Sequence, residues 1–219
     1  MHFKLHNKLY YIKWAFTIEN ATYTLKLRNN GTAIYTQSYE AHIASKGSNE
    51  LLGSYDWSDA EKITEAKIKS NYAKWEMQYK SKASSAFNTV KNDKGTKLIP
   101  VTDKAVDYII KYDNLSLKKS DGVQNDVEVH FDYDKAKLER TFYAGIKQPI
   151  RNLRIKLYTP DGLVTNVKFY AKTFLGRHYN IVPEIFLDEK KDGADKYYEK
   201  VVKHPKLFCK YIISWDWVQ

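Results

Sequence analysis

The 219-residue sequence contains a single cysteine, Cys209, and no long apolar run. One cysteine excludes an internal disulfide framework and favours a reducing compartment. No apolar stretch approaches the roughly 18 residues that a membrane-spanning helix requires. The first residues, Met1 to Leu5, are not followed by an apolar segment with a small-residue cleavage site, so we expect no signal peptide. The sequence therefore predicts a protein of the cytoplasm or of a virion, without a membrane span.

Motifs of common catalytic and cofactor sites are also missing. The sequence contains no Walker loop, no Gly-x-Gly-x-x-Gly, no Gly-x-Ser-x-Gly and no zinc knuckle. His2, His6 and His204 do not have the spacing of metal ligands. We therefore expect no cofactor, and the sequence favours a non-enzymatic protein over an enzyme.

Arginine is scarce in a chain that is nevertheless basic and aromatic. The formal net charge is +10, and the chain has 18 tyrosines and 5 tryptophans, a composition that suits sheets and interfaces. A basic surface attracts polyanions or acidic protein partners. Lysine lacks the forked geometry that reads guanine, which argues against sequence-specific DNA recognition. An AT-rich genome would give the same lysine excess. The few arginines are Arg28, Arg140, Arg151, Arg154 and Arg177.

Residues 152–172 predict a half-buried antiparallel hairpin with a three-residue turn at Pro160–Gly162. In that register apolar side chains share one side: Leu153, Ile155 and Leu157 opposite Phe169, Val167 and Thr165. The other side carries cations and tyrosines, which are candidate residues for binding nucleic acid or another polyanion: Arg154, Lys156, Tyr158, Lys168, Tyr170 and Lys172.

A second hairpin is predicted over Thr22–Tyr39, because Asn30-Gly31 is a strong signal for a two-residue loop. Such a loop pairs Leu27 with Ile34 and places Tyr23, Leu25 and Leu27 on one side. The polar side would hold Lys26, Arg28, Tyr35 and Gln37. Lys26 and Arg28 join the candidate polyanion-binding residues.

A long amphipathic helix is predicted from Ser58, where Ser58-x-x-Glu61 fits a capping box. Its apolar stripe follows the spacing i, i+4, i+7, i+11: Ile68, Tyr72, Trp75 and Tyr79. Two shorter helices are predicted, one from Thr102-Asp103 and one over Asp195–His204.

Two polar segments, residues 46–56 and 83–97, read as loops. The second is the best candidate for a domain boundary, which would separate residues 1–82 from residues 98–219. The main expectation is one domain over residues 1–219.

The strand predicted over Asp126–Asp134 contains the strongest candidate for catalysis. Glu128, His130 and Asp132 share one face, and carboxylates with one histidine could hold Mg²⁺ or Mn²⁺, as in metal-dependent nucleases. The other interpretation is a solvated face whose acids pair with the cations of neighbouring strands, Arg154, Lys156 or Lys168.

A second nuclease signal, Glu65-Ala66-Lys67, resembles the Glu-x-Lys half of a nuclease motif that lies on a strand. Here it falls inside the predicted long helix, which favours coincidence.

The chain ends in an aromatic segment, Leu207–Val218, that predicts a terminal strand. Tyr211, Trp215 and Trp217 share one of its faces and are the candidate interface residues. They suit either a strand that docks on a neighbour's sheet or an edge strand of this chain's own sheet.

These patterns together predict an α+β fold of mainly antiparallel sheet, with β-hairpins, one long amphipathic helix and two shorter ones. Three functions remain open. The first is a non-enzymatic structural or interaction protein, a subunit of an oligomer or hetero-assembly such as a viral or phage virion. The second is a non-specific nucleic-acid-binding protein. The third is a metal-dependent nuclease or other hydrolase.

Overall fold

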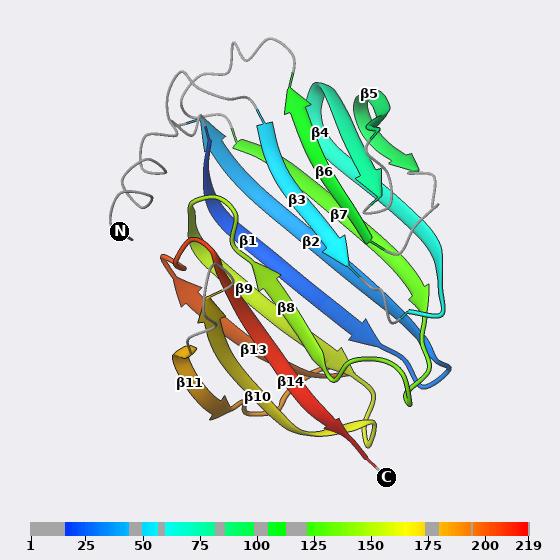
Figure 1. The fold of residues 1–219 in the computed structure, drawn as a ribbon, viewed down its shortest axis with the longest axis vertical. Helices are drawn as coiled ribbons and strands as arrows, with labels where there is room; N and C mark the ends of the chain where they lie inside the picture. The colour runs from blue at the N-terminus through cyan, green and yellow to red at the C-terminus, as the bar shows by residue number, and fades with distance from the viewer. Residues whose placement is uncertain are drawn as a thin grey trace.

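The structure is a computed structural model that describes residues 16–43, 50–56, 60–81, 86–98, 105–112, 122–173, 180–193 and 195–218. These residues form strands and no helix (Figure 1). The described part of the chain is therefore all-β, and the predicted α+β fold is wrong. None of these residues builds a helix with the length and apolar character of a membrane span.

The strands form two sheets. The larger has ten strands in the order β12-β13-β9-β1-β2-β7-β4-β6-β3, with β5 paired to β4. Its strands are β1 (Phe16–Leu27), β2 (Thr32–Ile43), β3 (Glu50–Asp56), β4 (Lys62–Ser81), β5 (Asn88–Leu98), β6 (Ala105–Tyr112), β7 (Gly122–Asp132), β9 (Ile150–Thr159), β12 (Lys190–Asp192) and β13 (Asp195–Lys203). The smaller sheet has the order β11-β10-β14-β8. Its strands are β8 (Thr141–Gly145), β10 (Val164–Thr173), β11 (Asn180–Phe186) and β14 (Cys209–Trp217).

One face of the large sheet is covered twice. The small sheet lies over part of it, and the ring of Phe142 on β8 contacts the ring of Tyr35 on β2 edge to face, with centroids 5.9 Å apart. The far end of the large sheet folds back over another part, so that Tyr108 on β6 donates a hydrogen bond to the amide oxygen of Gln37 on β2. In Figure 1 β3 and β6 lie in front of β2 and β7, and the small sheet lies in front of β9 and β1, on the same side of the large sheet. We call this covered side the inner face.

The long strand β4 replaces the predicted long helix. Its first part pairs with β7 and its second part with β5 and β6. Register shifts lie between Ile63 and Glu65 and between Ser70 and Lys74. Each irregularity breaks the alternation of a strand. The buried residues Ile68, Trp75 and Tyr79 are therefore spaced as in a helical stripe, although they lie on a strand.

The prediction of two shorter helices is also wrong. Residues of the first form β6, in which Val106, Tyr108 and Ile110 alternate into the core. The second is β13. Both predicted loops contain strands: β3 occupies the end of residues 46–56, and β5 covers most of residues 83–97. The large sheet includes strands from both sides of the suggested boundary.

The predicted hairpin at residues 152–172 has the right faces except at Thr165, which is exposed beside a register shift, and it has the wrong partners. Leu157 and Phe169 are buried, and the chain turns at Gly162 with φ +68°. However, β9 belongs to the large sheet and β10 to the small one, so the two strands are not paired with each other. Alternation identifies the buried face of a strand, but it does not identify the strand beside it.

The predicted hairpin at Asn30-Gly31 forms with a longer loop. The backbone N–H of Arg28 donates to the carbonyl oxygen of Thr32 at 3.0 Å, which encloses three residues instead of two. Gly31 adopts φ +76°, the left-handed conformation that closes such a loop.

This longer loop shifts the register of β1 and β2 by one residue. Leu27 lies opposite Ala33, not opposite Ile34 as predicted. Tyr35 and Gln37 consequently point into the core, where 3% and 2% of their surface is exposed. The prediction that they share the polar side of the hairpin is wrong, because a shift of one residue reverses the face of every side chain.

We expect the substitution Tyr108→Phe to lower the free energy of unfolding by about 1–3 kcal/mol, because it removes the hydroxyl donor from a buried amide. Tyr158→Phe is the control. The Tyr158 hydroxyl bonds an exposed carboxylate, that of Asp192, at 3.3 Å, and its loss should change stability by less than about 0.5 kcal/mol. Urea unfolding at neutral pH measures both. Equal losses in the two variants would contradict the buried contact.

Candidate functional site

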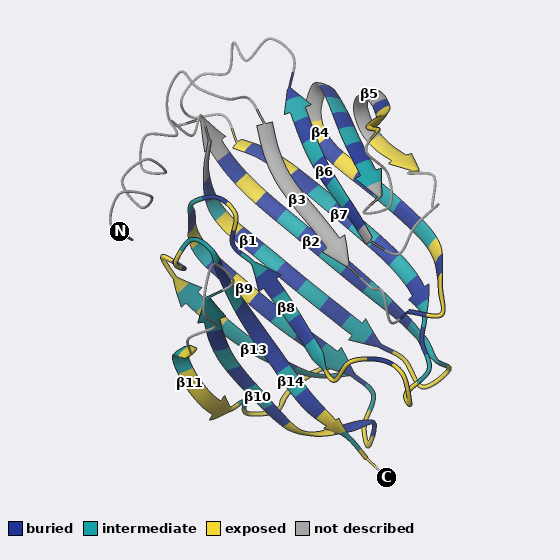
Figure 2. Cartoon of the chain, viewed as in Figure 1, coloured by how far each residue is buried: buried dark blue, intermediate teal, exposed yellow. Residues whose placement is uncertain are grey.

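The side of the large sheet opposite the inner face carries the candidate sites. Along β7 and β9, buried side chains alternate with side chains that are partly or fully exposed (Figure 2). We call this outward side of β13, β9, β1, β2, β7 and β4 the open face. Its middle is neutral and hydroxylated: Thr24 lies opposite Thr36, and Thr22 lies opposite Ser38.

A charged cluster lies on β4 and β7 of the open face. The His130 Nε2 atom is 2.5 Å from a carboxylate oxygen of Glu128. The Lys67 ammonium is 2.8 Å from the same oxygen and 3.2 Å from a carboxylate oxygen of Glu65. Burial alone would raise the pKa of Glu128, but the hydrogen bonds from His130 and Lys67 lower it below its usual value. We call these four residues the Glu128 cluster.

Glu65, Glu128 and His130 could hold a metal ion, since one ligand atom from each lies within 4.8 Å of the others. Lys67 already supplies positive charge there, because its ammonium bonds both carboxylates. Of the predicted catalytic residues, the structure brings Glu128 and His130 together and adds Glu65, whereas Asp132 is not in the group.

The Glu65-Ala66-Lys67 signal was attributed to coincidence because its segment reads as a helix, but the segment lies on strand β4. On a strand, residues two apart share a face, and the register sets Glu65 beside His130 and Lys67 beside Glu128. The acids of β7 were expected to pair with Arg154, Lys156 or Lys168. Glu128 pairs with a lysine of β4 instead.

A second group lies on β9 and β13. The rings of Tyr158 and Tyr197 stack with centroids 5.2 Å apart. The Lys156 ammonium is 5.7 Å from the first ring centre and 5.1 Å from the second. The Glu199 carboxylate is 2.7 Å from the ammonium of Lys190, whose hydrogen bond lowers the pKa of Glu199. We call Lys156, Tyr158, Tyr197 and Glu199 the cation–tyrosine cluster.

The eight predicted polyanion-binding residues do not form one surface. Those of the large sheet lie on its open face: Lys26, Arg154, Lys156 and Tyr158. Those of β10 point away from the core on the small sheet: Lys168, Tyr170 and Lys172. Arg28 is in the loop between β1 and β2.

Several of these cations have acidic partners. Lys26 is 2.5 Å from Asp195, and Lys168 is 3.3 Å from Glu184. Arg154 has a carboxylate oxygen of Glu199 at 3.8 Å. Pairing of this kind reduces the positive potential that a polyanion would meet.

The predicted interface residues lie on β14, which has β10 on one side and β8 on the other. Tyr211 and Trp215 are buried within this chain, at 2% and 3% exposure. Trp217 is partly buried and stacks on Tyr133, with centroids 5.9 Å apart. A contribution of these residues to an interface stays a prediction.

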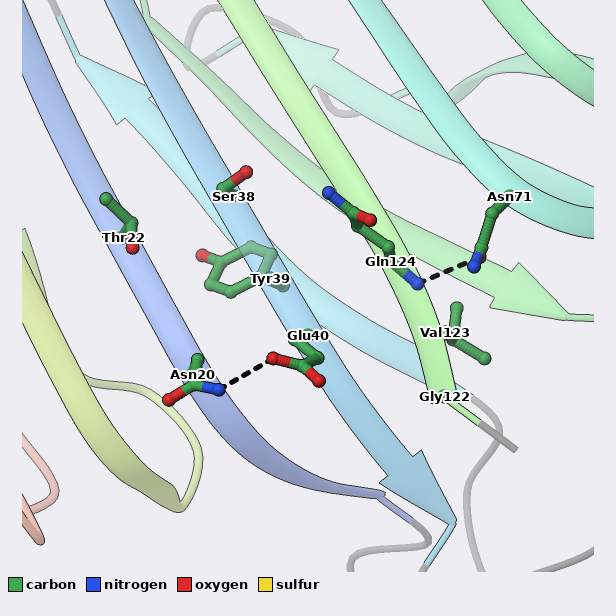
Figure 3. A pocket seen from close by; sticks show the side chains of 9 residues that line it. All are labelled: Asn20, Thr22, Ser38, Tyr39, Glu40, Asn71, Gly122, Val123 and Gln124. Atoms are coloured by element: carbon green, nitrogen blue, oxygen red, sulfur yellow. Dashed lines mark hydrogen bonds between the residues drawn. The ribbon is translucent and has the colours of Figure 1, made fainter. Parts of the chain in front are cut away.

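A polar hollow of about 430 Å³ opens at one end of the open face (Figure 3). Asn20 donates a hydrogen bond to the Glu40 carboxylate at 2.6 Å, and the backbone N–H of Gln124 donates to the Asn71 side chain at 2.8 Å. The described residues that line it are Asn20, Thr22, Ser38, Tyr39, Glu40, Asn71, Gly122, Val123 and Gln124. Sequence reasoning missed this site because its residues come from four strands and follow no motif.

No family of known proteins matches the sequence, and no curated protein matches it either. Solved structures do resemble the fold. A protein of Parabacteroides distasonis described as a candidate protease aligns with a TM-score of 0.50 and 9% identity, over 92% of this chain and 40% of that chain. The yeast LTA4 hydrolase aligns with a TM-score of 0.47 and 11% identity, over 92% of this chain and 29% of that one. An M1 zinc metallopeptidase of Deinococcus radiodurans aligns with a TM-score of 0.44 and 7% identity, over 92% of this chain and 43% of that one.

At such identities the resemblance shows the fold alone. The chain spans about two fifths of the length of the Parabacteroides protein. The all-β architecture described above therefore also occurs as one part of a longer chain.

We expect Lys67→Met to raise the pKa of Glu128, because it removes a hydrogen bond and a positive charge. The pKa of Glu128 is lowered in the folded chain, so its ionised form stabilises the fold above the pKa of an unfolded glutamate. That contribution disappears as the pH falls through the folded pKa. The variant should lose up to about 1 kcal/mol of stability at pH 7 and almost none near pH 3.

Carboxyl NMR titration measures the pKa, and urea unfolding at the two pH values measures the stability. Lys62→Met is the matched control, because Lys62 lies on the same strand and has no ion-pair partner among the described residues. An unchanged Glu128 pKa in Lys67→Met would show that the cluster does not form.

Proposed function

We propose that this chain is a non-enzymatic interaction module that works within a larger protein assembly, and that the cation–tyrosine cluster is its docking surface. The observation that carries the proposal is the stacked pair of Tyr158 and Tyr197 on the open face, with the Lys156 ammonium against both rings. Tyrosine is enriched where partners bury one another, because a ring offers a large contact area and a polar tip.

The composition of the surrounding surface also suits a protein partner. Val201 lies two residues from Glu199 along β13 and is 44% exposed, which adds apolar area beside the charged groups. Glu199 is nearly enclosed by basic side chains, so its negative charge is already compensated. Tyrosine is enriched in protein interfaces, whereas lysine and glutamate are depleted at their centre, so the tyrosine pair would form the centre of the contact and the charged groups its rim.

The edge of the sheet next to this cluster offers backbone groups. Strand β12 pairs only with residues 195–197 of β13. Within the described ranges, residues 198–203 therefore have a strand neighbour on one side only, which is β9. A free strand edge can accept a further strand from a partner.

The comparisons are consistent with such a role. A similar fold forms part of a longer chain described as a candidate protease. The present sequence lacks the His-Glu-x-x-His motif that supplies two zinc ligands and a general base in many zinc peptidases. We therefore infer a supporting role beside a catalytic partner, with no catalysis by this chain.

Site-specific photo-crosslinking tests the docking surface. A benzophenone amino acid at Tyr197, on the open face, should give one discrete protein adduct in the source organism, and Lys156→Glu should abolish it. The same probe at Tyr170, on the outer side of the small sheet, is the control and should give no such adduct. No adduct at Tyr197, or the same adduct from both positions, would contradict the proposal.

Metal-dependent hydrolysis is a second candidate, supported by the arrangement of Glu65, Glu128 and His130. A metal ion would have to displace the Lys67 ammonium from the two carboxylates. This candidate requires Mn²⁺- or Mg²⁺-dependent cleavage of a phosphodiester that Glu65→Gln and His130→Ala each abolish. Activity without metal dependence, or full activity in His130→Ala, eliminates it.

A further inference from the structure

The outer side of the small sheet carries aromatic and basic side chains on three neighbouring strands. Along β10, Lys168, Tyr170 and Lys172 point away from the core, because residues two apart on a strand share a face. Phe186 on β11 lies opposite Lys168, and Lys210 on β14 lies opposite Lys172. We call these five residues the small-sheet patch.

Two aromatic rings of the patch are accessible to a ligand. Phe186 is 69% exposed, at the end of a strand that is exposed along most of its length (Figure 2). Tyr170 is partly exposed, whereas Ile212, its neighbour on β14, is 3% exposed and offers little surface. Diagonal neighbours on paired strands lie about 7–8 Å apart, so two flat ligand groups could rest on the two rings side by side.

The lysines of the patch are only partly neutralised. Lys168 is 3.3 Å from the Glu184 carboxylate, and its ammonium is 5.2 Å from the centre of the Phe186 ring. Lys172 and Lys210 lie directly opposite each other, and neither has an acidic partner among the residues that the structure describes. Like charges in opposite positions destabilise a sheet, so a bound anion would stabilise this pair.

A further acid lies at the other end of the patch. Glu139 accepts a hydrogen bond from Thr141 at 3.0 Å, in the row of paired positions that contains Lys168. At the opposite end the Lys210 ammonium is 4.0 Å from the centre of the Tyr143 ring, which holds the ammonium in place without neutralising its charge. Positive charge therefore accumulates at the Lys210 end of the patch.

This combination of groups fits a single-stranded nucleic acid better than other acidic ligands. Lysines contact phosphates, and bases stack on aromatic rings whatever their sequence. The bases of a duplex are already stacked, and lysine lacks the forked geometry that reads base edges. An acidic protein is a poorer match, since lysine is depleted at the centre of protein interfaces.

We propose that the small-sheet patch binds single-stranded nucleic acid without sequence preference. Bases stack on Phe186 and Tyr170, and phosphates pair with Lys172 and Lys210. The patch belongs to the small sheet and the cation–tyrosine cluster to the large one, so the inference stands whether or not that cluster docks a protein.

Fluorescence anisotropy with a labelled oligothymidylate of about eight nucleotides tests the assignment. We expect saturable binding with a Kd of about 0.1 mM at low salt. The logarithm of the affinity should fall against the logarithm of the salt concentration with a slope of about −1.4, which corresponds to phosphate contacts by the two opposed lysines. Tyr170→Ala and Phe186→Ala should each weaken binding about tenfold, whereas Tyr170→Phe keeps the ring and should bind as the parent does. Lys172→Glu should weaken binding by at least about tenfold.

Lys203→Glu is the matched control, because Lys203 is an exposed lysine of β13 and its reversal changes the net charge by the same amount. This variant should bind as the parent does, and circular dichroism confirms that each variant is folded. The proposal is overturned if the oligonucleotide does not saturate the protein up to about 1 mM. It is also overturned if a duplex or a polyglutamate peptide of the same charge binds as tightly, or if Lys203→Glu weakens binding as much as Lys172→Glu. Full binding by Tyr170→Ala, or equal losses in Tyr170→Phe and Tyr170→Ala, would likewise overturn it.

Discussion

This fold depends on the need of buried polar groups for hydrogen-bond partners inside the protein. The buried hydrogen bond between Tyr108 and Gln37 meets that need at the centre of the large sheet. Gln37 lies in the middle of the large sheet, and the residue is 2% exposed, so its buried amide needs a partner inside the protein. Tyr108 supplies one such partner from the folded-back end of the same sheet, and Tyr23 and Tyr35 on β1 and β2 also bond this amide. The small sheet covers the neighbouring strands, where Phe142 contacts Tyr35. Both covers lie on one side, which leaves the other side of the central strands to carry polar and charged groups.

That asymmetry determines where function can reside. A sheet with one buried and one solvated face presents a row of alternate side chains from every strand. The Glu128 cluster, the cation–tyrosine cluster and the polar hollow each combine residues from neighbouring strands that are far apart in the sequence. Asn71 and Gln124, for example, meet because β4 and β7 are paired, although 53 residues separate them.

The alternation of apolar and polar residues correctly predicted which face of several strands is buried. Val127, Val129 and Phe131 are buried on β7 as expected, while Glu128 and His130 point outward. The pattern could not identify strand neighbours, because a period of two is the same whichever strand lies alongside. The sequence pattern therefore could not predict that β9 pairs with β1 and β13, or that β10 pairs with β14 and β11.

The remaining errors have local causes. The irregularities of β4 gave Ile68, Trp75 and Tyr79 a helix-like spacing, so the Glu65-Ala66-Lys67 signal was attributed to coincidence. A loop longer by one residue at Gly31 reversed the predicted face of Tyr35. The hollow beside Asn20 had no sequence signal, since amide side chains on separate strands resemble ordinary surface residues.

The most direct test of this account is hydroxyl-radical footprinting of the unmodified chain, read tyrosine by tyrosine with mass spectrometry. The structure predicts strong protection of Tyr35, Tyr39 and Tyr108, which are buried, and ready oxidation of Tyr158 and Tyr197 on the open face. Unfolding in urea should remove the difference. Oxidation of Tyr35 as fast as Tyr158 in the folded chain would contradict the covered inner face, and with it the assignment of the opposite face as the binding surface.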